Sequence, residues 1–380
     1  MPYRLYVRRS RHIITSIMII SSLVLRRLAN QRINGDRFER PAEVVRWMGA
    51  MQAQDYAQAV WAVGLRTASA ALSDVEQAIA DKKIVRTWPM RGTLHFVPPE
   101  DAQWMLQLSA ARTLARSRRR HEQLGLDQAV LERGRQLFYD ALRGGGCLSR
   151  ADMMALLENA GIPAGNQRGY HMLGYAALTG LICMGPLREK QQTFVLLDEW
   201  APHARELPRE EALAELARRY FSSRGPAALR DFAWWAGLPL GDARTGLAAA
   251  GPMLVSQTIQ GEEYWQARES AAPDGDQAGD FHLLPGFDEY LLGYTDRGAV
   301  LSRQNAQKIV PGNNGVFKPM VVVDGQIVGA WKRILKKKAV EIVLSPFWQI
   351  ALPEASVLEA ARQYSDFLGL SLSTASVEAI

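Results

Sequence analysis

The sequence predicts an α+β fold in which three tandem winged-helix motifs precede a β-rich C-terminal region. Three times along the chain, helical hydrophobic spacing is followed by two short strand-like runs around a turn. An Asp-Gly pair at positions 324 and 325 lies between two apolar runs, which is a strong β-hairpin signal. The composition, 48% hydrophobic and 22% charged over 380 residues, is that of a globular protein with two to three domains.

The first motif begins with four predicted helices. Pro41 suits the first turn of the second helix, and Val44 and Met48 follow it at helical spacing. Ser73 followed by Glu76 predicts a capping box at the start of the fourth. Two strands then complete the winged-helix order. Within residues 18–125 we expect elements at Leu23–Arg32, Pro41–Met51, Tyr56–Leu65, Ser73–Lys82, Ile84–Met90 and Gly92–Val97.

The second and third motifs repeat this order without obvious sequence identity. Ser149 is expected to cap a helix and Pro226 to open one. In residues 126–205 we expect helices at Asp127–Leu142, 149–161 and Asn166–Thr179, and strands at Leu181–Met184 and Thr193–Leu197. In residues 206–270 we expect helices at Glu210–Phe221, Pro226–Trp235 and Leu240–Ala249, and strands at Met253–Ile259 and Glu262–Gln266.

The C-terminal region, residues 280–380, follows a predicted loop at Ala271–Gly279. Strands at Phe317–Val323 and Gln326–Trp331 flank the Asp-Gly pair, and Glu354–Leu368 is expected to form a last helix.

The net charge of +6 is concentrated at the N-terminus. Residues 1–17 hold four arginines and no acidic residue, so the chain from Met18 onward carries only +2. The apolar run Ile13–Leu25 follows, but it leads directly into Arg26 without a signal-peptidase site and is too short to span a bilayer. We therefore interpret residues 1–17 as a translated leader upstream of a start at Met18, and expect a cytoplasmic protein that does not contact membranes.

Two basic clusters offer phosphate contacts to DNA. Winged helices place a recognition helix in the major groove, and Arg168 lies in the helix expected at Asn166–Thr179, which has that position here. Solvated surface charge is the alternative interpretation of both clusters. No dimerisation heptad is present, so we expect a monomer. The first cluster is Arg112, Arg116, Arg118, Arg119 and Arg120, and the second is Lys332, Arg333, Lys336, Lys337 and Lys338.

The motifs of common enzyme classes are absent from the sequence. None of the six histidines has metal-helix spacing, and no phosphate-binding loop, nucleophile elbow or dinucleotide-binding motif occurs. Two cysteines exclude a disulfide scaffold and a cysteine-only zinc ribbon. We expect neither a metal nor a cofactor. His95 shares a strand face with Arg91 and Thr93, and is either an accessory site residue or a hydrogen-bonded structural histidine.

Three strings together resemble the winged-helix DNA glycosylases related to the azinomycin-resistance enzyme. They are Met51-Gln-Ala-Gln-Asp55, Arg86-Thr-Trp-Pro-Met-Arg-Gly-Thr-Leu-His95 and Leu283-Leu-Pro-Gly-Phe-Asp-Glu-Tyr290. The resemblance extends from about Leu23 to Leu370. It implies tandem winged helices around a concave DNA-binding surface, and hydrolysis of the N-glycosidic bond of N7-alkylated guanine in double-stranded DNA, including interstrand cross-links.

The resemblance also implies the site residues. The family's catalytic signature of Gln, an apolar residue and then Gln or Asp reads Gln52-Ala53-Gln54 here. The family uses a β-hairpin against DNA, which corresponds to the segment with Asp324 and Gly325 at its turn.

The chemistry constrains the backbone at this motif. Residues at i and i+2 share a face only in an extended segment, so the helix that starts at Pro41 must end near Met51. N7-alkylguanine is a cationic leaving group, so the reaction needs a positioned water and dipoles more than a general acid.

Alternatives remain for the site and for the function. No lysine lies between Arg4 and Asp81 to form a Schiff base near the motif, so we expect a monofunctional glycosylase. Asp55 and Asp288 are the alternative bases, although an ion pair of Asp288 with Arg297 would be purely structural. A non-catalytic winged-helix DNA-binding protein or transcriptional regulator is the alternative function.

Overall fold

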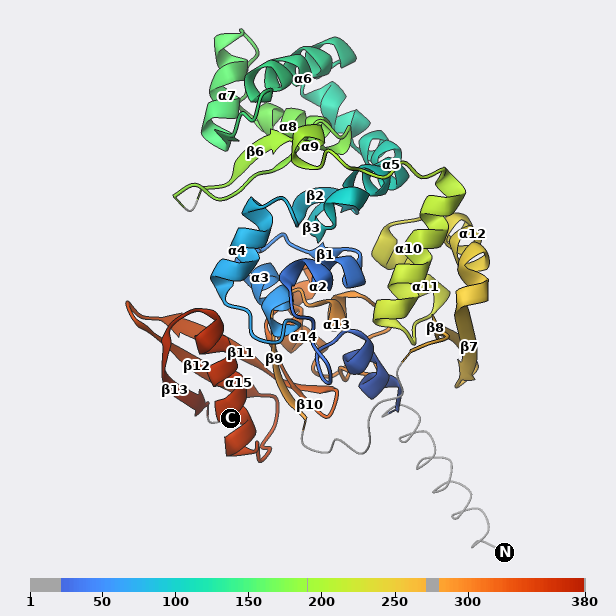
Figure 1. The fold of residues 1–380 in the computed structure, drawn as a ribbon, viewed down its shortest axis with the longest axis vertical. Coiled ribbons are helices and arrows are strands. Elements are labelled where there is room, and N and C mark those ends of the chain that lie inside the picture. Colours follow the sequence, from blue (N-terminus) through green and yellow to red (C-terminus); the bar gives the residue numbers. More distant parts are fainter. Residues whose placement is uncertain (1–21, 190, 271–279, 379–380) are drawn as a thin grey trace, which may run out of the picture.

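The computed structural model describes residues 22–189, 191–270 and 280–378, and its architecture is α+β, as predicted (Figure 1). The proposed leader at 1–17 and the loop at 271–279 lie outside the described residues. A helical lobe, a central body and a C-terminal sheet follow one another along the longest axis of the molecule (Figure 1). No helix in the described ranges has the length and apolarity needed to cross a membrane.

The first segment contains a short helix at residues 22–30 and three further helices. Pro41 opens α2 as predicted, but the helix ends at Met48 because Gly49 adopts a φ of 72°. The prediction that Ser73 caps α4 was wrong. The cap is Ala71, whose N–H donates to the Asp74 carboxylate at 2.7 Å, so the helix begins at Leu72. The elements are α2 (Pro41–Met48), β1 (Met51–Gln52), α3 (Tyr56–Leu65) and α4 (Leu72–Ala80).

The hairpins of the first two segments join into one six-stranded sheet of order β1-β3-β2-β5-β6-β4. The junction is the antiparallel pairing of Arg86 with Met184. Two separate wings were expected, and the long-range pairing between them was not predicted. The remaining strands of this sheet are β2 (Val85–Met90), β3 (Thr93–Val97), β4 (Leu148–Ser149), β5 (Ile182–Met184) and β6 (Thr193–Leu196).

The helices of the second and third segments occur in the predicted order. Ser149 caps α7 as predicted, since its hydroxyl accepts the Asp152 N–H at 3.2 Å. The helix α5, which carries the first basic cluster, was not predicted. The elements are α5 (Ala102–Gln123), α6 (Gln128–Leu142), α7 (Arg150–Asn159), α8 (Arg168–Leu178), α9 (Leu197–Trp200), α10 (Arg209–Arg224), α11 (Leu229–Ala236), α12 (Leu240–Ala250), β7 (Leu254–Ile259) and β8 (Glu262–Ala267).

The C-terminal region forms a five-stranded sheet of order β13-β12-β11-β10-β9. The hairpin at Asp324-Gly325 is confirmed, with Val323 paired to Gln326 and positive φ at both turn residues. A second hairpin, around Lys337, was not predicted. The elements are β9 (Phe281–Leu284), α13 (Glu289–Leu292), α14 (Ala306–Ile309), β10 (Met320–Val323), β11 (Gln326–Leu335), β12 (Ala339–Pro346), α15 (Glu354–Phe367) and β13 (Ser371–Val377).

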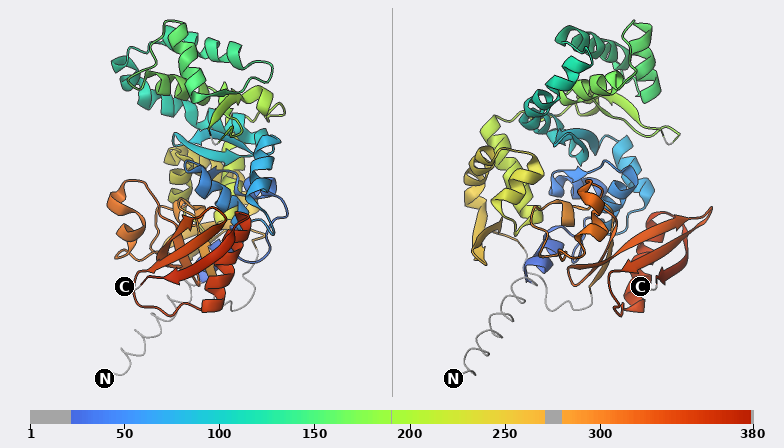
Figure 2. Two further views of the ribbon diagram at one scale, coloured as in Figure 1. Left: turned by 90° about the vertical axis from the view of Figure 1, so that its left-hand side faces the viewer. Right: turned by 180° about the vertical axis from the view of Figure 1, so that it is seen from behind.

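The first segment and the C-terminal region share one hydrophobic core. Trp61 on α3 packs edge-on against Tyr364 and tilted against Phe367, both on α15. Its indole N–H donates to the Leu283 carbonyl at 2.9 Å, across 222 positions of sequence. Figure 2 shows the C-terminal sheet and α15 lying beside the central helices. Segments at opposite ends of the chain therefore fix one another.

Gly64 on α3 supplies a test of this packing. A Cβ at this position would lie 2.3 Å from the Phe367 ring. We expect Gly64→Ala to lower the free energy of unfolding by about 1–3 kcal/mol, as overpacking does in a tight core. Urea denaturation measures the change. Gly241→Ala is the control, because that helical glycine has nothing within 4 Å of its Cβ position. Equal stability of the two variants would contradict the shared core.

Candidate active site

The Gln-Ala-Gln motif lies outside the helices, between α2 and α3, and its first residue is the last of the short strand β1. Gln52 pairs with His95 of β3, and the Ala53 N–H donates to the Leu94 carbonyl at 2.7 Å. Strand β1 ends at Gln52, and Gln54 lies in the bend that precedes α3. Asp55 is occupied as the N-cap of α3, where its side chain accepts the Gln58 N–H.

Buried charged groups hold the backbone of this segment on both sides. Before the motif, Arg224 donates to the carbonyls of Met48 and Ala50 at 2.8 and 2.6 Å. Within the motif, Arg86 donates twice to the Ala53 carbonyl, at 3.0 and 2.7 Å. These bonds restrict the motif to one conformation, so its two side chains project from a fixed backbone.

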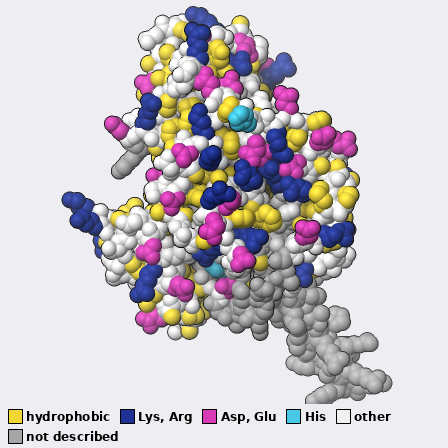
Figure 3. Space-filling view, viewed as in Figure 1, with side chains coloured by type: hydrophobic (Ala, Val, Ile, Leu, Met, Phe, Trp, Pro, Cys, Tyr) yellow, Lys and Arg dark blue, Asp and Glu magenta, His cyan; other side chains and the backbone are white. Residues whose placement is uncertain are grey.

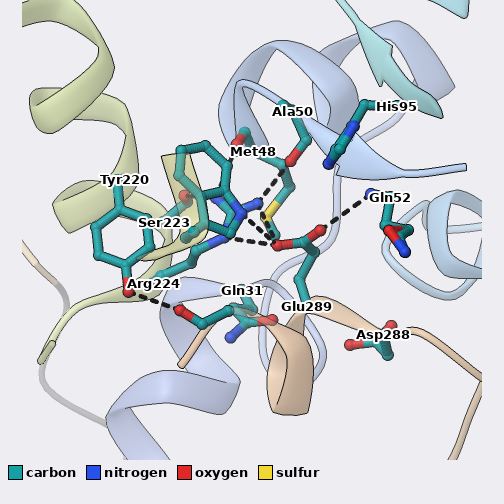
Figure 4. A network of polar contacts seen from close by, with 12 residues as sticks. Gln31, Met48, Ala50, Gln52, His95, Tyr220, Ser223, Arg224, Asp288 and Glu289 are labelled. Carbon is teal, nitrogen blue, oxygen red and sulfur yellow. Dashed lines mark hydrogen bonds and ion pairs between the residues drawn. The ribbon is translucent and has the colours of Figure 1, made fainter. Parts of the chain in front are cut away.

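Glu289 also bonds the motif directly, and sequence reasoning missed it. Its Oε1 accepts the Gln52 N–H at 3.0 Å, and its Oε2 accepts from Arg224 at 2.8 Å and from the Trp235 indole at 2.8 Å (Figure 4). Burial alone would raise the pKa of this carboxyl, but Arg224 and Arg91 outweigh burial and lower the pKa. Glu289 is therefore ionised, and it fixes the backbone of Gln52.

The two glutamines have different surroundings. The Oε1 of Gln52 is buried and has no hydrogen-bond partner among the described residues. Gln54 is exposed, its Oε1 accepts the Leu94 N–H at 3.2 Å, and it lines a cavity of about 720 Å³. An unpaired buried carbonyl oxygen is costly, so Gln52 holds an acceptor whose hydrogen bond is not satisfied within the described residues.

His95 is fully buried and neutral. Its Nδ1 lies 2.9 Å from the Thr93 carbonyl and its Nε2 lies 3.2 Å from an Arg91 guanidinium nitrogen. Burial, assisted by the charge of Arg91, lowers the pKa of His95 to about 3. The contact with the carbonyl places the proton on Nδ1, which leaves Nε2 as an acceptor for Arg91. The imidazole is thus unsuited to act as a cationic acid at neutral pH.

Asp288 is not brought to the motif. Both of its oxygens accept from Arg66 at 2.9 Å in an ion pair whose side chains are 0% exposed. It also caps α13 by accepting the Tyr290 N–H. The expected partner was Arg297, which instead donates to the Leu291 carbonyl. Asp288 therefore holds the helix that presents Glu289, and its neighbour rather than Asp288 itself reaches Gln52.

The structure packs the turn at Asp324-Gly325 against the central body. The Gly325 carbonyl accepts the Tyr290 hydroxyl at 2.7 Å, and a Cβ on Gly325 would lie 2.7 Å from Val24. Asp324 accepts the Asp280 N–H at 3.1 Å. This turn does not project outward.

Three predicted DNA-contacting residues lie on the second hairpin of the C-terminal sheet. Lys332 pairs with Glu378 at 2.7 Å and Lys336 with Glu341 at 3.1 Å. Arg333 donates to the Tyr364 hydroxyl. The hairpin tip with Lys337 and Lys338 is exposed, and its basic side chains are visible at the far left of the molecular surface (Figure 3).

Arg168 and the arginines of α5 complete the predicted basic groups. Arg168 is partly buried and donates to the carbonyls of Pro163, at 2.9 Å, and of Leu124. Its guanidinium therefore bonds the protein's own backbone. All five α5 arginines are exposed, and Arg118 among them pairs with Glu122 at 3.1 Å. Within the described ranges, no three side chains of His, Cys, Asp or Glu gather to hold a metal ion.

Comparisons with known proteins confirm the resemblance. The sequence model of a family described as DNA glycosylase AlkZ-like matches residues 45–367. An interstrand DNA cross-link repair glycosylase of Streptomyces sahachiroi is 27% identical over 350 residues, which cover 87% of this chain and 91% of the relative. The solved structure of Streptomyces sahachiroi DNA glycosylase AlkZ has the same fold, with a TM-score of 0.80 and 24% identity over 94% of this chain and 99% of that one.

Glu289→Gln tests the role of the buried carboxylate. The substitution keeps the side-chain shape but leaves Arg224 buried without a counter-charge, which costs about 3–5 kcal/mol in general. We expect urea denaturation to show a loss of that order in the free energy of unfolding. Glu378→Gln, which breaks the exposed pair with Lys332, is the control and should cost less than about 1 kcal/mol. An equal loss of unfolding free energy in the two variants would show that the buried pair contributes no more to stability than the exposed one.

The lowered pKa of His95 predicts acid sensitivity. The unfolded chain protonates this histidine near pH 6.5 and the folded chain only near pH 3, so stability falls as the pH drops through that window. Between pH 7 and pH 5, His95 should account for about 2 kcal/mol of lost stability. His95→Gln should remove that part of the slope in urea denaturation at the two pH values. An unchanged slope would show that His95 is protonated in the folded protein.

Proposed function

The chain belongs to the DNA glycosylase AlkZ-like family of N-glycosyl hydrolases, and from this premise we propose that it excises N7-alkylated guanine from duplex DNA and unhooks interstrand cross-links. The proposal on cross-links follows the name of the Streptomyces sahachiroi relative. The observation that carries the proposal is the Gln52-Ala53-Gln54 segment, whose backbone is held by the buried groups Glu289 and Arg86 and which carries two amide side chains. A non-catalytic regulator is not favoured, because the family is one of enzymes.

The proposed reaction suits amide side chains. Alkylation at N7 makes the guanine cationic, so the electron pair of the C1′–N9 bond leaves with N9 and neutralises that charge. The sugar becomes oxocarbenium-like, and water attacks C1′ and loses its proton to the surrounding water. The free Oε1 of Gln52 would accept a hydrogen bond from this water and stabilise the developing positive charge, with Gln54 beside it. No strong base is required.

Fixed dipoles explain why the neutral glutamines sit among charged groups. An oxyanion-hole-type effect depends on groups that need not reorganise as the charge develops. Glu289 pairs with Arg224 and bonds the Gln52 amide, and Arg86 bonds the Ala53 carbonyl, so these charged groups hold the backbone at the motif. Gln52 and Gln54 are left as the polar side chains directed away from that framework.

For DNA contact we propose the hairpin between β11 and β12 and the exposed face of α5. The hairpin tip carries Lys337 and Lys338, and it projects to the same side of the central helices as the loop before β6 (Figures 1 and 2). Exposed cations that neutralise phosphates release counter-ions, so binding through them weakens steeply with salt. These two elements, rather than the packed turn at Asp324-Gly325, supply such cations.

Base release tests the proposal. On duplex DNA with one N7-methylguanine, Gln52→Ala and Gln54→Ala should each slow single-turnover release by about 10²-fold, the usual cost of one transition-state-stabilising group. Gln136→Ala is the control, because that glutamine is exposed on α6 and contacts only Asp140. If the double variant matches the wild type, the glutamines are not catalytic. If the wild type releases no alkylated base and unhooks no cross-link, the substrate proposal is wrong.

A further inference from the structure

We propose that the cavity beside Gln54 binds the substituent on the alkylated base, and that it selects bulky aromatic groups over a methyl group. This inference rests on the proposed function and names the substrate class of the same site. The cavity lies between the β2–β3 hairpin and the helices α7 and α8. Gln54 and Leu94 form its edge at the motif. A group held in the cavity would therefore remain next to the bond that is broken.

The walls of the cavity are suited to a planar apolar group. Trp88, Phe194 and Tyr170 contribute aromatic rings, and Met154 and Leu173 add apolar surface. Such rings contact flat hydrophobic ligands over large areas. A guanine base would instead need paired donors and acceptors for its Watson–Crick edge. The polar side chains of the lining are Gln54, Arg150, Gln191 and Gln192, and no carboxylate is found among its described residues to accept the guanine N–H groups as Asp or Glu would.

The size of the cavity also favours the substituent. Its volume of about 720 Å³ is in the range that holds a drug-sized ligand, and a methyl group would leave it almost empty. Tyr170 is 59% exposed, so part of its ring is free to contact a bound group. The Arg150 guanidinium lies 6.0 Å from the centre of this ring, at the outer range of a cation–π contact. An aromatic group entering here would cover Tyr170.

A smaller neighbouring cavity of about 240 Å³ connects the site to the basic helix. It shares Trp88, Tyr170 and Gly174 with the larger cavity and reaches Thr113 and Ser117 on α5. The exposed arginines lie on the same helix, so a DNA backbone bound along α5 would run past the mouth of both cavities. DNA binding and substituent binding are thus compatible in one complex.

Gly174 on α8 allows the cavity to be filled without disturbing the fold. It lines both cavities, and nothing lies within 4 Å of its Cβ position. Most residues are also better helix formers than glycine. Gly241→Phe is the matched control, since Gly241 lies on α12 with the same open surroundings and lines neither cavity.

The experiment compares two duplexes, one with N7-methylguanine and one with N7-benzylguanine, in single-turnover base release. We expect wild type to bind the benzyl substrate at least ~10-fold more tightly, the effect of about 1.4 kcal/mol of added contact. Gly174→Phe should lower benzyl release at least ~10-fold and leave methyl release within about 2-fold. Tyr170→Ala should weaken benzyl binding in the same selective way.

Each failure has its own signature. If Gly174→Phe lowers release of both bases equally, or of neither, while wild type and Gly241→Phe are active, the cavity does not hold the substituent and the proposal is overturned. If wild type releases neither base, the proposed function fails and this inference fails with it. Thermal melting of each variant identifies a loss of fold, and a selective effect of Tyr170→Ala would then still support the cavity.

Discussion

Two consecutive carboxylates at the start of α13 determine how the parts of this protein meet. Asp288 pairs with Arg66 at the end of α3, and Glu289 pairs with Arg224 at the end of α10. Both pairs are buried, and a buried charge without its partner costs several kcal/mol. The C-terminal region, the first segment and the third segment must therefore assemble together, because each supplies a charge that another must neutralise.

The motif that we propose to be catalytic is positioned by this assembly. Arg224 bonds the carbonyls of Met48 and Ala50, and Glu289 bonds the amide of Gln52, so the ion pair holds three successive points of the same backbone. Glutamine is a weak base and a modest dipole. Its usefulness in a hydrolase depends on being held still, since a dipole that must reorient during the reaction stabilises less charge. The stability of the fold and the rigidity of the site thus have one source.

Local sequence patterns predicted what is local in this structure. Hydrophobic spacing located most helices, Asp324-Gly325 located its turn, and the resemblance located Gln52 in an extended segment. The hydrophobic pattern did not predict that Arg86 would pair with Met184. A single antiparallel pair between residues about a hundred positions apart does not change the hydrophobic periodicity of either strand. The contacts of Glu289 and Arg224 could not be predicted from the sequence either. Neighbouring acidic residues look alike in sequence, and only packing decides which one faces the motif.

The junction at Arg86 and Met184 has a consequence for how this architecture is inherited. The second segment does not stand as a separate module, because β5 completes the hydrogen bonding of β2 in a shared sheet. Exchange of that segment between relatives would expose a β-edge, which invites pairing with other chains, unless the incoming segment brought a strand of matching register. The helical lobe and the catalytic body are therefore expected to change together over evolution. A new lobe must first form a strand that pairs with this sheet, because the protein has to fold before it can act on a substrate.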